Sequence, residues 1–239
     1  EASKEGTPQG GPLSPLLSNI MLNELDKELE RRGLPFVRYA DDSMIFCKSK
    51  RAARRVKESI TRFIENTLYL KVNKEKTVES YVGGVKYLGY SFYMMKGKCQ
   101  LTIHPKSKAR MKSRLKELTS RSNGWGYAKR KQKLKEYIRG WVGYYHLANM
   151  KRLLLETDEW LRRRIRMCIW KAWKKVKTKV ANLTRCGINK YKAYEWGNTR
   201  KGYWRIAGSP ILKMAIDNNK LRSAEYATLM GAYLEWHPK

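Results

Sequence analysis

The hydrophobic pattern of this chain changes near residue 104, and that change constrains the fold more than any other feature. Upstream, helical spacing alternates with short apolar runs of strand length, whereas downstream the apolar residues recur at helical spacing in three successive segments rich in Lys and Arg. The sequence therefore predicts an α+β domain over 1–103, with helices packed on a small antiparallel sheet. A helical domain over 104–180 and a basic, aromatic-rich extension over 181–239 are expected to follow.

The first domain opens with a well-marked helix. Ser14 is the expected N-cap, Pro15 suits the first helical position, and apolar residues then recur every four positions until Gly33 stops the helix. The remaining elements expected before residue 104 are, in chain order, strands at 36–40 and 43–47, a helix at 50–66, a strand at 68–72 and a hairpin of 83–95 with 99–103.

Two adjacent carboxylates lie where two strand-forming runs meet, in the stretch FVRYADDSMIFC over 36–47. Packing does not require Asp41 and Asp42 to lie side by side, and a divalent ion would relieve their repulsion. Two carboxylates at a hairpin tip form a hard oxygen site suited to Mg²⁺, the ion that phosphoryl transfer uses. An Asp-Asp dipeptide taken alone is more often a solvated turn, so the pair indicates a metal site only in its context.

The loop PQGGPLSP, residues 8–15, precedes the first helix. Its glycines let the backbone approach a nucleotide closely, and the N–H groups of a helix N-terminus favour phosphate. The alternative is an ordinary Gly/Pro loop before a helix. One helix separates this loop from the Asp41–Asp42 hairpin and can bring both onto the same surface, so the two together favour a nucleotide site.

Charge points to a polyanionic partner. The 239 residues hold 52 Lys and Arg against 21 Asp and Glu, a formal net charge of +31, which makes nucleic acid the first candidate. Residues 1–50 contain 7 Lys and Arg against 8 Asp and Glu, so the later residues carry the excess, 45 against 13.

The four cysteines form no CxxC pair, which indicates neither a zinc site nor a disulfide framework and fits a reducing cytosol. No apolar stretch is long enough to span a bilayer, so we expect a cytoplasmic protein, bacterial or organellar, with no membrane partner. Because the chain begins at Glu1 without an initiator Met, we also expect an interior fragment of something longer.

Two basic segments are candidates for RNA contact. The helix EWLRRRIRMCIWKAWKKVKTK (159–179) carries an apolar stripe and a cationic remainder with few acids, and the stretch over 189–205 interleaves aromatic rings with cations. Arginine suits phosphate, and rings stack on bases; a solvated helix face and aromatic core packing are the alternatives. The candidate RNA-binding residues are Arg139, Arg162, Arg163, Arg166, Lys174, Arg200, Lys201, Tyr203 and Trp204.

GTPQGGPLSPLLSNIMLNELD (6–26) followed by FVRYADD (36–42) resembles consecutive motifs of reverse transcriptases. The continuation through VNKEKT, VKYLGYSF and RGWVGYYHLANM is similar to group II intron reverse transcriptase/maturases, and the resemblance covers essentially the whole chain. It implies a partial palm over 1–103 and a helical thumb, or domain X, that binds intron RNA.

The resemblance also implies roles for individual residues. Asp41 and Asp42 match the catalytic, Mg²⁺-binding aspartates, with Asp41 the more secure ligand. The residues matched to template and nucleotide contact are Gln9, Gly10, Tyr39, Ala40 and, near the triphosphate, Lys76; those matched to the primer grip are Leu88 and Gly89.

One feature of the family is missing. Its third catalytic aspartate lies on a strand upstream of the loop that opens this chain, and the remaining aspartates here are Asp26, Asp158 and Asp217, none in such a strand. We therefore expect an RNA-directed DNA polymerase and splicing maturase, acting on intron RNA, a DNA primer or target and dNTPs. Its polymerase site would be completed by an N-terminal reverse transcriptase segment, and this chain alone would be inactive.

Two alternatives remain open: an RNA-binding splicing cofactor without polymerase activity, and a general RNA-binding protein with a coincidental YADD. The sequence lacks the paired cysteines of the endonuclease that some family members carry, which argues against DNA cleavage.

Overall fold

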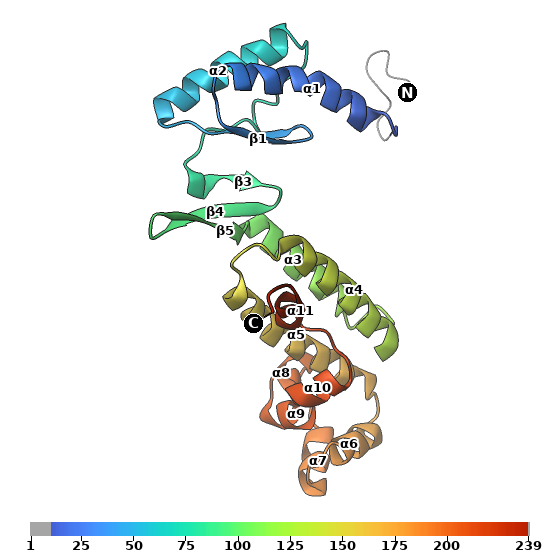
Figure 1. Ribbon diagram of the computed structural model, residues 1–239. Coiled ribbons are helices and arrows are strands. Elements are labelled where there is room, and N and C mark those ends of the chain that lie inside the picture. The colour runs from blue at the N-terminus through green and yellow to red at the C-terminus, as the bar shows by residue number, and fades with distance from the viewer. Residues whose placement is uncertain (1–10, 239) are drawn as a thin grey trace. The chain divides into compact units, whose positions relative to one another are not determined.

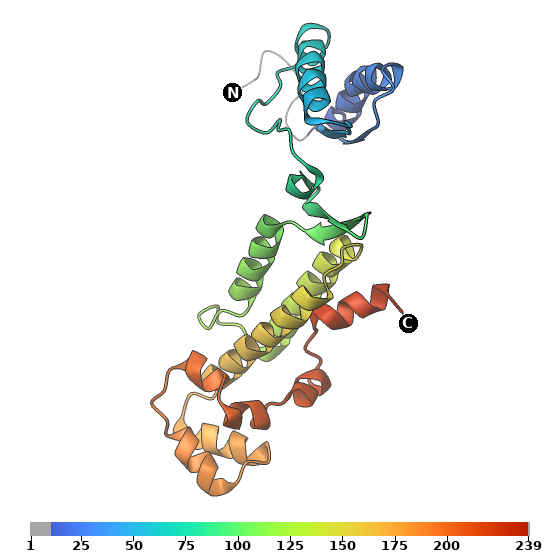
Figure 2. The ribbon, with the colours of Figure 1, turned by 90° about the vertical axis from the view of Figure 1, so that its left-hand side faces the viewer.

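The chain divides into two compact units, residues 1–87 and residues 88–239, of which the computed structural model describes residues 11–238 (Figures 1 and 2). Helices combined with small antiparallel hairpins make the chain α+β, as the sequence predicts. The functional limits at 103/104 and 180/181 stay predictions.

The first unit packs two helices over one face of a hairpin (Figure 1). Its elements are α1 (Ser14–Arg31), β1 (Phe36–Tyr39), β2 (Asp42–Ile45), α2 (Lys50–Asn66), a 3-10 turn (Val82–Gly84) and β3 (Lys86–Tyr87). The core consists of Leu25 and Leu29 of α1, Ile60 of α2 and Leu68, and the hairpin adds Phe36 and other partly buried apolar side chains. This small core positions the hairpin that carries Asp41 and Asp42.

The predicted helix α1 forms and buries Leu25 and Leu29, whereas Leu17 and Met21 are 46% and 43% exposed. Two local predictions for this unit were wrong. Ser14 is the first residue of α1 and Leu13 occupies the N-cap position. The strand expected at 68–72 does not form, because the backbone at Tyr69 has φ of 55°, a left-handed conformation that interrupts an extended run.

The second unit begins with a hairpin and continues as helices. The hairpin is β4 (Tyr90–Met95) with β5 (Lys98–Ile103), paired from Tyr90 opposite Ile103 to Met95 opposite Lys98. Three long helices form as predicted: α3 (Pro105–Leu118), α4 (Tyr127–Tyr145) and α5 (Lys151–Ala172). The single helix expected over 159–179 is wrong at its C-terminal end, because α5 ends at Ala172 and a separate helix begins at Val176.

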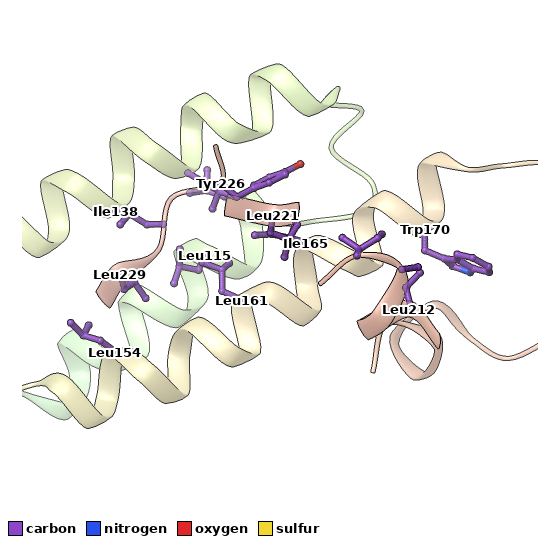
Figure 3. Packing of buried hydrophobic residues seen from close by; sticks show 14 of the residues in the cluster. Leu115, Ile138, Leu154, Leu161, Ile165, Trp170, Leu212, Leu221, Tyr226 and Leu229 are labelled. Carbon is purple, nitrogen blue, oxygen red and sulfur yellow. The ribbon is translucent and has the colours of Figure 1, made fainter. Parts of the chain in front are cut away.

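The C-terminal region is more helical than the sequence predicts. The sequence of this region predicts only one short helix, near 224–234. Residues 176–236 form α6 (Val176–Arg185), α7 (Lys190–Gly197), α8 (Tyr203–Ala207), α9 (Pro210–Ala215), α10 (Asn218–Ser223) and α11 (Leu229–Trp236). These helices share one core with α3, α4 and α5. Figure 3 shows Leu212, Leu221 and Leu229 in the same cluster as Leu115 and Leu161. The region is therefore an integral part of the second unit.

A buried carboxylate fastens α11 to α5. Asp158, 2% exposed, accepts hydrogen bonds from the backbone N–H groups of Leu229 (2.8 Å) and Met230 (2.9 Å). Burial raises the pKa of Asp158, against the effect of the two backbone donors. The carboxylate satisfies N–H groups at the start of α11, which no residue of that helix can pair.

Among residues 11–238 no helix is both long and apolar enough to cross a membrane.

Candidate functional site

The register of the first hairpin presents the carboxylate pair at its tip. Phe36 pairs with Ile45 and Tyr39 with Asp42, which leaves Ala40 and Asp41 as the turn. Asp42 is thus the first residue of β2, not a turn residue, and its side chain shares a face with that of Tyr39. Asp41 and Asp42 are both exposed, and so is Tyr39, at 65%. The fold brings together four of the predicted site residues.

A half-buried ion pair holds the tip in place. The Arg38 guanidinium donates from Nε to the Asp26 carboxylate at 2.8 Å, and from Nη1 to Asn19 Oδ1 and the Ala40 carbonyl oxygen, both at 2.9 Å. The Asp26 carboxylate raises the pKa of Arg38 through these hydrogen bonds. Because Ala40 has φ of 54°, the turn is conformationally costly, and Arg38 ties its carbonyl to α1.

The donor set at the tip suits Mg²⁺. That ion takes one or two carboxylates and completes its octahedron with water and substrate phosphate oxygens, so two exposed carboxylates on a fixed hairpin fit it. The hydroxyl of Tyr87 is buried and has no hydrogen-bond partner. This burial and, in smaller part, the charge of Asp42 raise the pKa of Tyr87. In residues 11–238 no three His, Cys, Asp or Glu side chains cluster as a metal site.

Each remaining aspartate is occupied elsewhere. Asp26 pairs with Arg38, Asp158 holds the start of α11, and Asp217 is the N-cap of α10, accepting from Lys220 N at 2.7 Å. None of them is available as a third ligand beside Asp41 and Asp42.

The residues matched to the primer grip form a strained turn in the second unit. Leu88 and Gly89 have φ of 50° and 82°, and a Cβ on Gly89 would lie 2.3 Å from the Tyr145 hydroxyl. The Tyr144 hydroxyl donates to the Leu88 carbonyl oxygen, and the Ser107 hydroxyl to that of Gly89, each at 3.0 Å. The turn is therefore built onto α3 and α4, and only glycine fits at residue 89.

The other predicted nucleotide contacts are less defined. Lys76 is exposed in a turn organised by Asn73, whose side-chain oxygen accepts from the backbone N–H groups of Glu75 and Lys76, each at 3.1 Å. Gln9 and Gly10 lie outside the described residues.

The second unit holds nearly all of the excess charge. Residues 88–239 contain 36 Lys and Arg against 9 Asp and Glu, whereas residues 1–87 contain 16 against 12. Ion pairing cannot neutralise the second unit, so its surface is cationic.

The arginines of α5 do not all belong to that surface. Arg166 is 6% exposed, and its guanidinium donates to the Ile216 carbonyl oxygen at 2.7 Å and to Asn218 Oδ1 at 2.9 Å. Burial lowers the pKa of Arg166. Arg163 donates to the Trp204 carbonyl oxygen at 3.0 Å and stacks on the Trp204 ring at 4.0 Å. Arg166 is thus committed to the interior, and Arg163 joins α5 to α8.

The remaining predicted RNA contacts are accessible. Arg139 is exposed and lies 3.8 Å from the Glu235 carboxylate, a pairing worth little at a surface. Lys174 and Arg200 are exposed, and Arg162 is half-buried. Lys201 lies over the Trp196 ring at 5.0 Å. Tyr203 and Trp204 are 38% and 39% exposed.

Sequence reasoning missed a second basic group. Lys116, Arg121 and Arg164, from α3, the loop after it and α5, border one cavity with Trp204. The sequence signal for this group was the excess of Lys and Arg over acids after residue 105. Only the fold shows that the Arg164 side chain is directed toward the end of α3, where it donates to Thr119 Oγ1 at 2.6 Å.

An α+β unit with two carboxylates on a hairpin is followed in the chain by a strongly cationic helical unit, a combination that suits a protein acting on nucleic acid. Residues 1–92 match the family described as reverse transcriptase (RNA-dependent DNA polymerase), and residues 108–187 match the group II intron maturase-specific domain. The chain belongs to the group II intron reverse transcriptase/maturase family.

Two curated proteins are similar to parts of this chain. Protein YkfC of Escherichia coli K12 is 32% identical over 124 residues, covering 37% of this chain and 32% of the relative. The group II intron-encoded protein LtrA of Lactococcus lactis subsp. cremoris is 29% identical over 150 residues, covering 36% of this chain and 25% of LtrA. The matched part is thus at most about a third of the length of these relatives.

Proposed function

We propose that this chain binds group II intron RNA through its second unit and contributes the Asp41–Asp42 hairpin to an RNA-directed DNA polymerase that also assists splicing. The observation that carries the proposal is the charge of residues 88–239, 36 cations against 9 acids, in the unit whose residues 108–187 match the maturase-specific domain. An unneutralised cationic surface binds RNA by releasing the counterions condensed on its phosphates.

The hairpin supports the polymerase part of the proposal. Asp41 and Asp42 would hold Mg²⁺, which when bound stabilises charge on the oxygens of a transferring phosphoryl group. Arg38 keeps the tip fixed, and the exposed Tyr39 ring lies on the Asp42 face, where a dNTP or a DNA primer end would approach. The turn at Leu88 and Gly89 would hold the primer strand.

A splicing cofactor without polymerase activity is the second candidate, and one observation favours it. Asp26, Asp158 and Asp217 are all occupied elsewhere, so the carboxylate pair has no third aspartate within this chain. We propose that DNA synthesis requires a further carboxylate from an N-terminal reverse transcriptase segment, whereas RNA binding does not.

RNA binding is tested by titrating a group II intron RNA, and an unrelated structured RNA of equal length, at several salt concentrations. Each phosphate contact should contribute roughly −0.7 to −0.9 to the log–log salt slope. A steep slope is expected for both RNAs, with tighter binding of the intron. A flat salt dependence, or no intron binding, would refute the proposal.

The metal site is tested without measuring activity. Fe²⁺ substituted for Mg²⁺, with ascorbate and peroxide, should cleave the backbone next to its ligands, and we expect cleavage near residue 41 that Asp41→Asn abolishes. Asp26→Asn is a poor control because it breaks the Arg38 ion pair, so Glu30→Gln, which removes an exposed carboxylate of α1, is the matched control.

The need for a third carboxylate is tested by primer extension. The chain alone should yield no cDNA, and robust Mg²⁺-dependent synthesis would refute that need.

A further inference from the structure

A cavity of about 600 Å³ lies between the C-terminal end of α3, the loop that follows it, and α5, with Trp204 of α8 at its wall. Its volume falls within the range of small-molecule sites, roughly 300–1,000 Å³. All of its lining residues belong to the second unit. None of the residues predicted from sequence except Trp204 contributes to it.

One side of the cavity is cationic. Lys116, Arg121 and Arg164 line it, and among residues 11–238 none of the three forms an ion pair with a carboxylate. The one acid in the lining, Glu117, is engaged by Arg114 at 2.7 Å. Burial, and in smaller part the charge of Arg121, lowers the pKa of Arg164. Because Arg121 and Arg164 repel one another and Lys116 has no acidic partner, an anion bound between these three side chains would be stabilised.

The Arg164 guanidinium is held rigidly. It donates to Thr119 Oγ1 at 2.6 Å, to the Lys116 carbonyl oxygen at 3.0 Å and to the Thr119 carbonyl oxygen at 3.1 Å. The charge is thus preorganised in the wall, so an incoming anion does not have to order it.

The other side is apolar. Met167, 5% exposed, and the ring of Trp204 face the cavity. Arg163 stacks on Trp204 but borders the neighbouring cavity of about 510 Å³ and not this one. The Trp204 ring therefore keeps a surface in the 600 Å³ cavity that no described aromatic or cationic group covers, and such surfaces stack on bases.

We propose that this cavity binds one unpaired nucleotide of a single-stranded nucleic acid, with the base stacked on Trp204 against Met167 and the phosphate held by Lys116, Arg121 and Arg164. Ser113 and Ser120 also line the cavity, and their hydroxyls suit the sugar. The proposal names a subsite of the RNA-binding unit and so rests on the proposed function.

The neighbouring cavity is a poorer phosphate site. Its charged lining consists of four cations and three acids: Arg162, Arg163, Arg166, Lys213, Glu156, Glu159 and Asp217. Its carboxylates repel phosphate, so it provides a matched control in the same region.

The test is photo-cross-linking of the whole chain to a single-stranded 12-nucleotide RNA that carries one 5-iodouridine, with the site mapped by mass spectrometry. Cross-linking at Trp204 is expected, and the same RNA in a duplex should not give it. Labelling by RNA alone would assign the site to RNA, and equal labelling by the matching DNA would assign it to any single strand.

Trp204→Ala should weaken single-strand binding by about 5- to 150-fold, the loss of one stacked base, and Trp204→Phe should restore most of it. Lys116→Gln should lower the salt slope by roughly 0.7 and reduce the fraction of bound RNA cross-linked at Trp204. Lys213→Gln removes an exposed lysine of the other cavity and should leave that fraction unchanged.

Labelling elsewhere than Trp204, equal labelling by duplex, or the same loss in Lys213→Gln as in Lys116→Gln would overturn the proposal. If intron RNA binds with a steep salt slope while Trp204 is not labelled, only the nucleotide site fails. If no intron RNA binds at all, the proposed function fails.

Discussion

Arg166 provides the sharpest test of how the cationic helix α5 divides its charges between the interior and RNA. The sequence places Arg166 among the RNA contacts, whereas the structure buries it against the Ile216 carbonyl oxygen and Asn218. We expect Arg166→Gln to reduce the stability of the second unit and to leave its affinity for RNA per folded molecule unchanged.

The magnitude follows from the two hydrogen bonds. A hydrogen bond to a charged group contributes about 1.5–3 kcal/mol, and a buried acceptor left unpaired costs about 1–3 kcal/mol. Burial of the guanidinium, which lowers the pKa of Arg166, offsets part of the gain. A net loss of about 2–4 kcal/mol in the free energy of unfolding is therefore expected, or roughly 1–2 M in the urea midpoint for an m-value of about 2 kcal/mol/M.

Urea unfolding followed by tryptophan fluorescence suits this measurement, because all eight tryptophans lie in residues 88–239 and report on the second unit alone. Arg200→Gln is the matched control, since Arg200 is exposed and the charge change is the same. It should leave the midpoint unchanged and, if it contacts a phosphate, lower the salt slope by roughly 0.7. An unchanged midpoint in Arg166→Gln, together with a reduced salt slope, would refute the reasoning.

Three further outcomes are expected. Because burial raises the pKa of Asp158 above its ordinary value, the folded state holds more protons than the unfolded state between those two pKa values. The stability that this group contributes is therefore fully present below the unfolded-state pKa and falls as pH rises. As pH drops through that window, the urea midpoint of the wild type should rise relative to the midpoint of Asp158→Asn. The opposite trend would contradict this reasoning. Gly89→Ala should lower the thermal midpoint of the second unit by several degrees, roughly 1–3 kcal/mol, because its Cβ meets the Tyr145 hydroxyl at a positive φ, and an unchanged midpoint would show that the turn can relax. Asp41→Asn with Asp42→Asn should abolish Fe²⁺ cleavage at the hairpin and leave the affinity for intron RNA unchanged in a filter-binding titration, whereas an equal loss of affinity would place the hairpin on the RNA surface.

The parts of the fold that local pattern dictates were predictable. The hairpin at residues 36–45 and the three long helices after Pro105 follow from strand-forming runs and from apolar residues at helical spacing. Of the helices between 176 and 236 only the last, α11, lies near a predicted helix, because helices of five to ten residues are too short to show a helical period and are stabilised mainly by tertiary packing. Tyr69 shows the converse: its run alternates like a strand, but it has no partner strand and the backbone turns.

The candidate site divides in the same way. Asp41 and Asp42 are adjacent in sequence, so their position at the tip follows from the hairpin alone. The partners of Arg163, Arg164 and Arg166 lie 41 to 52 residues away in the chain, and no local pattern tells which arginine turns inward. For that reason sequence reasoning assigned Arg166 to RNA and passed over Arg164.

A unit with 36 cations and 9 acids must limit its own repulsion before any RNA arrives. Few carboxylates are available, so α5 uses arginines to satisfy carbonyl groups of the helices packed against it, including those of residues 116, 119, 204 and 216. Aromatic rings take up a further share: in residues 11–238 every cation stacked over a ring lies in the second unit. The interleaved rings and cations, which the sequence suggests as an RNA-binding motif, therefore also stabilise the folded second unit. Trp204 serves both purposes, because Arg163 occupies the ring on the side of one cavity and leaves the other cavity open to a base.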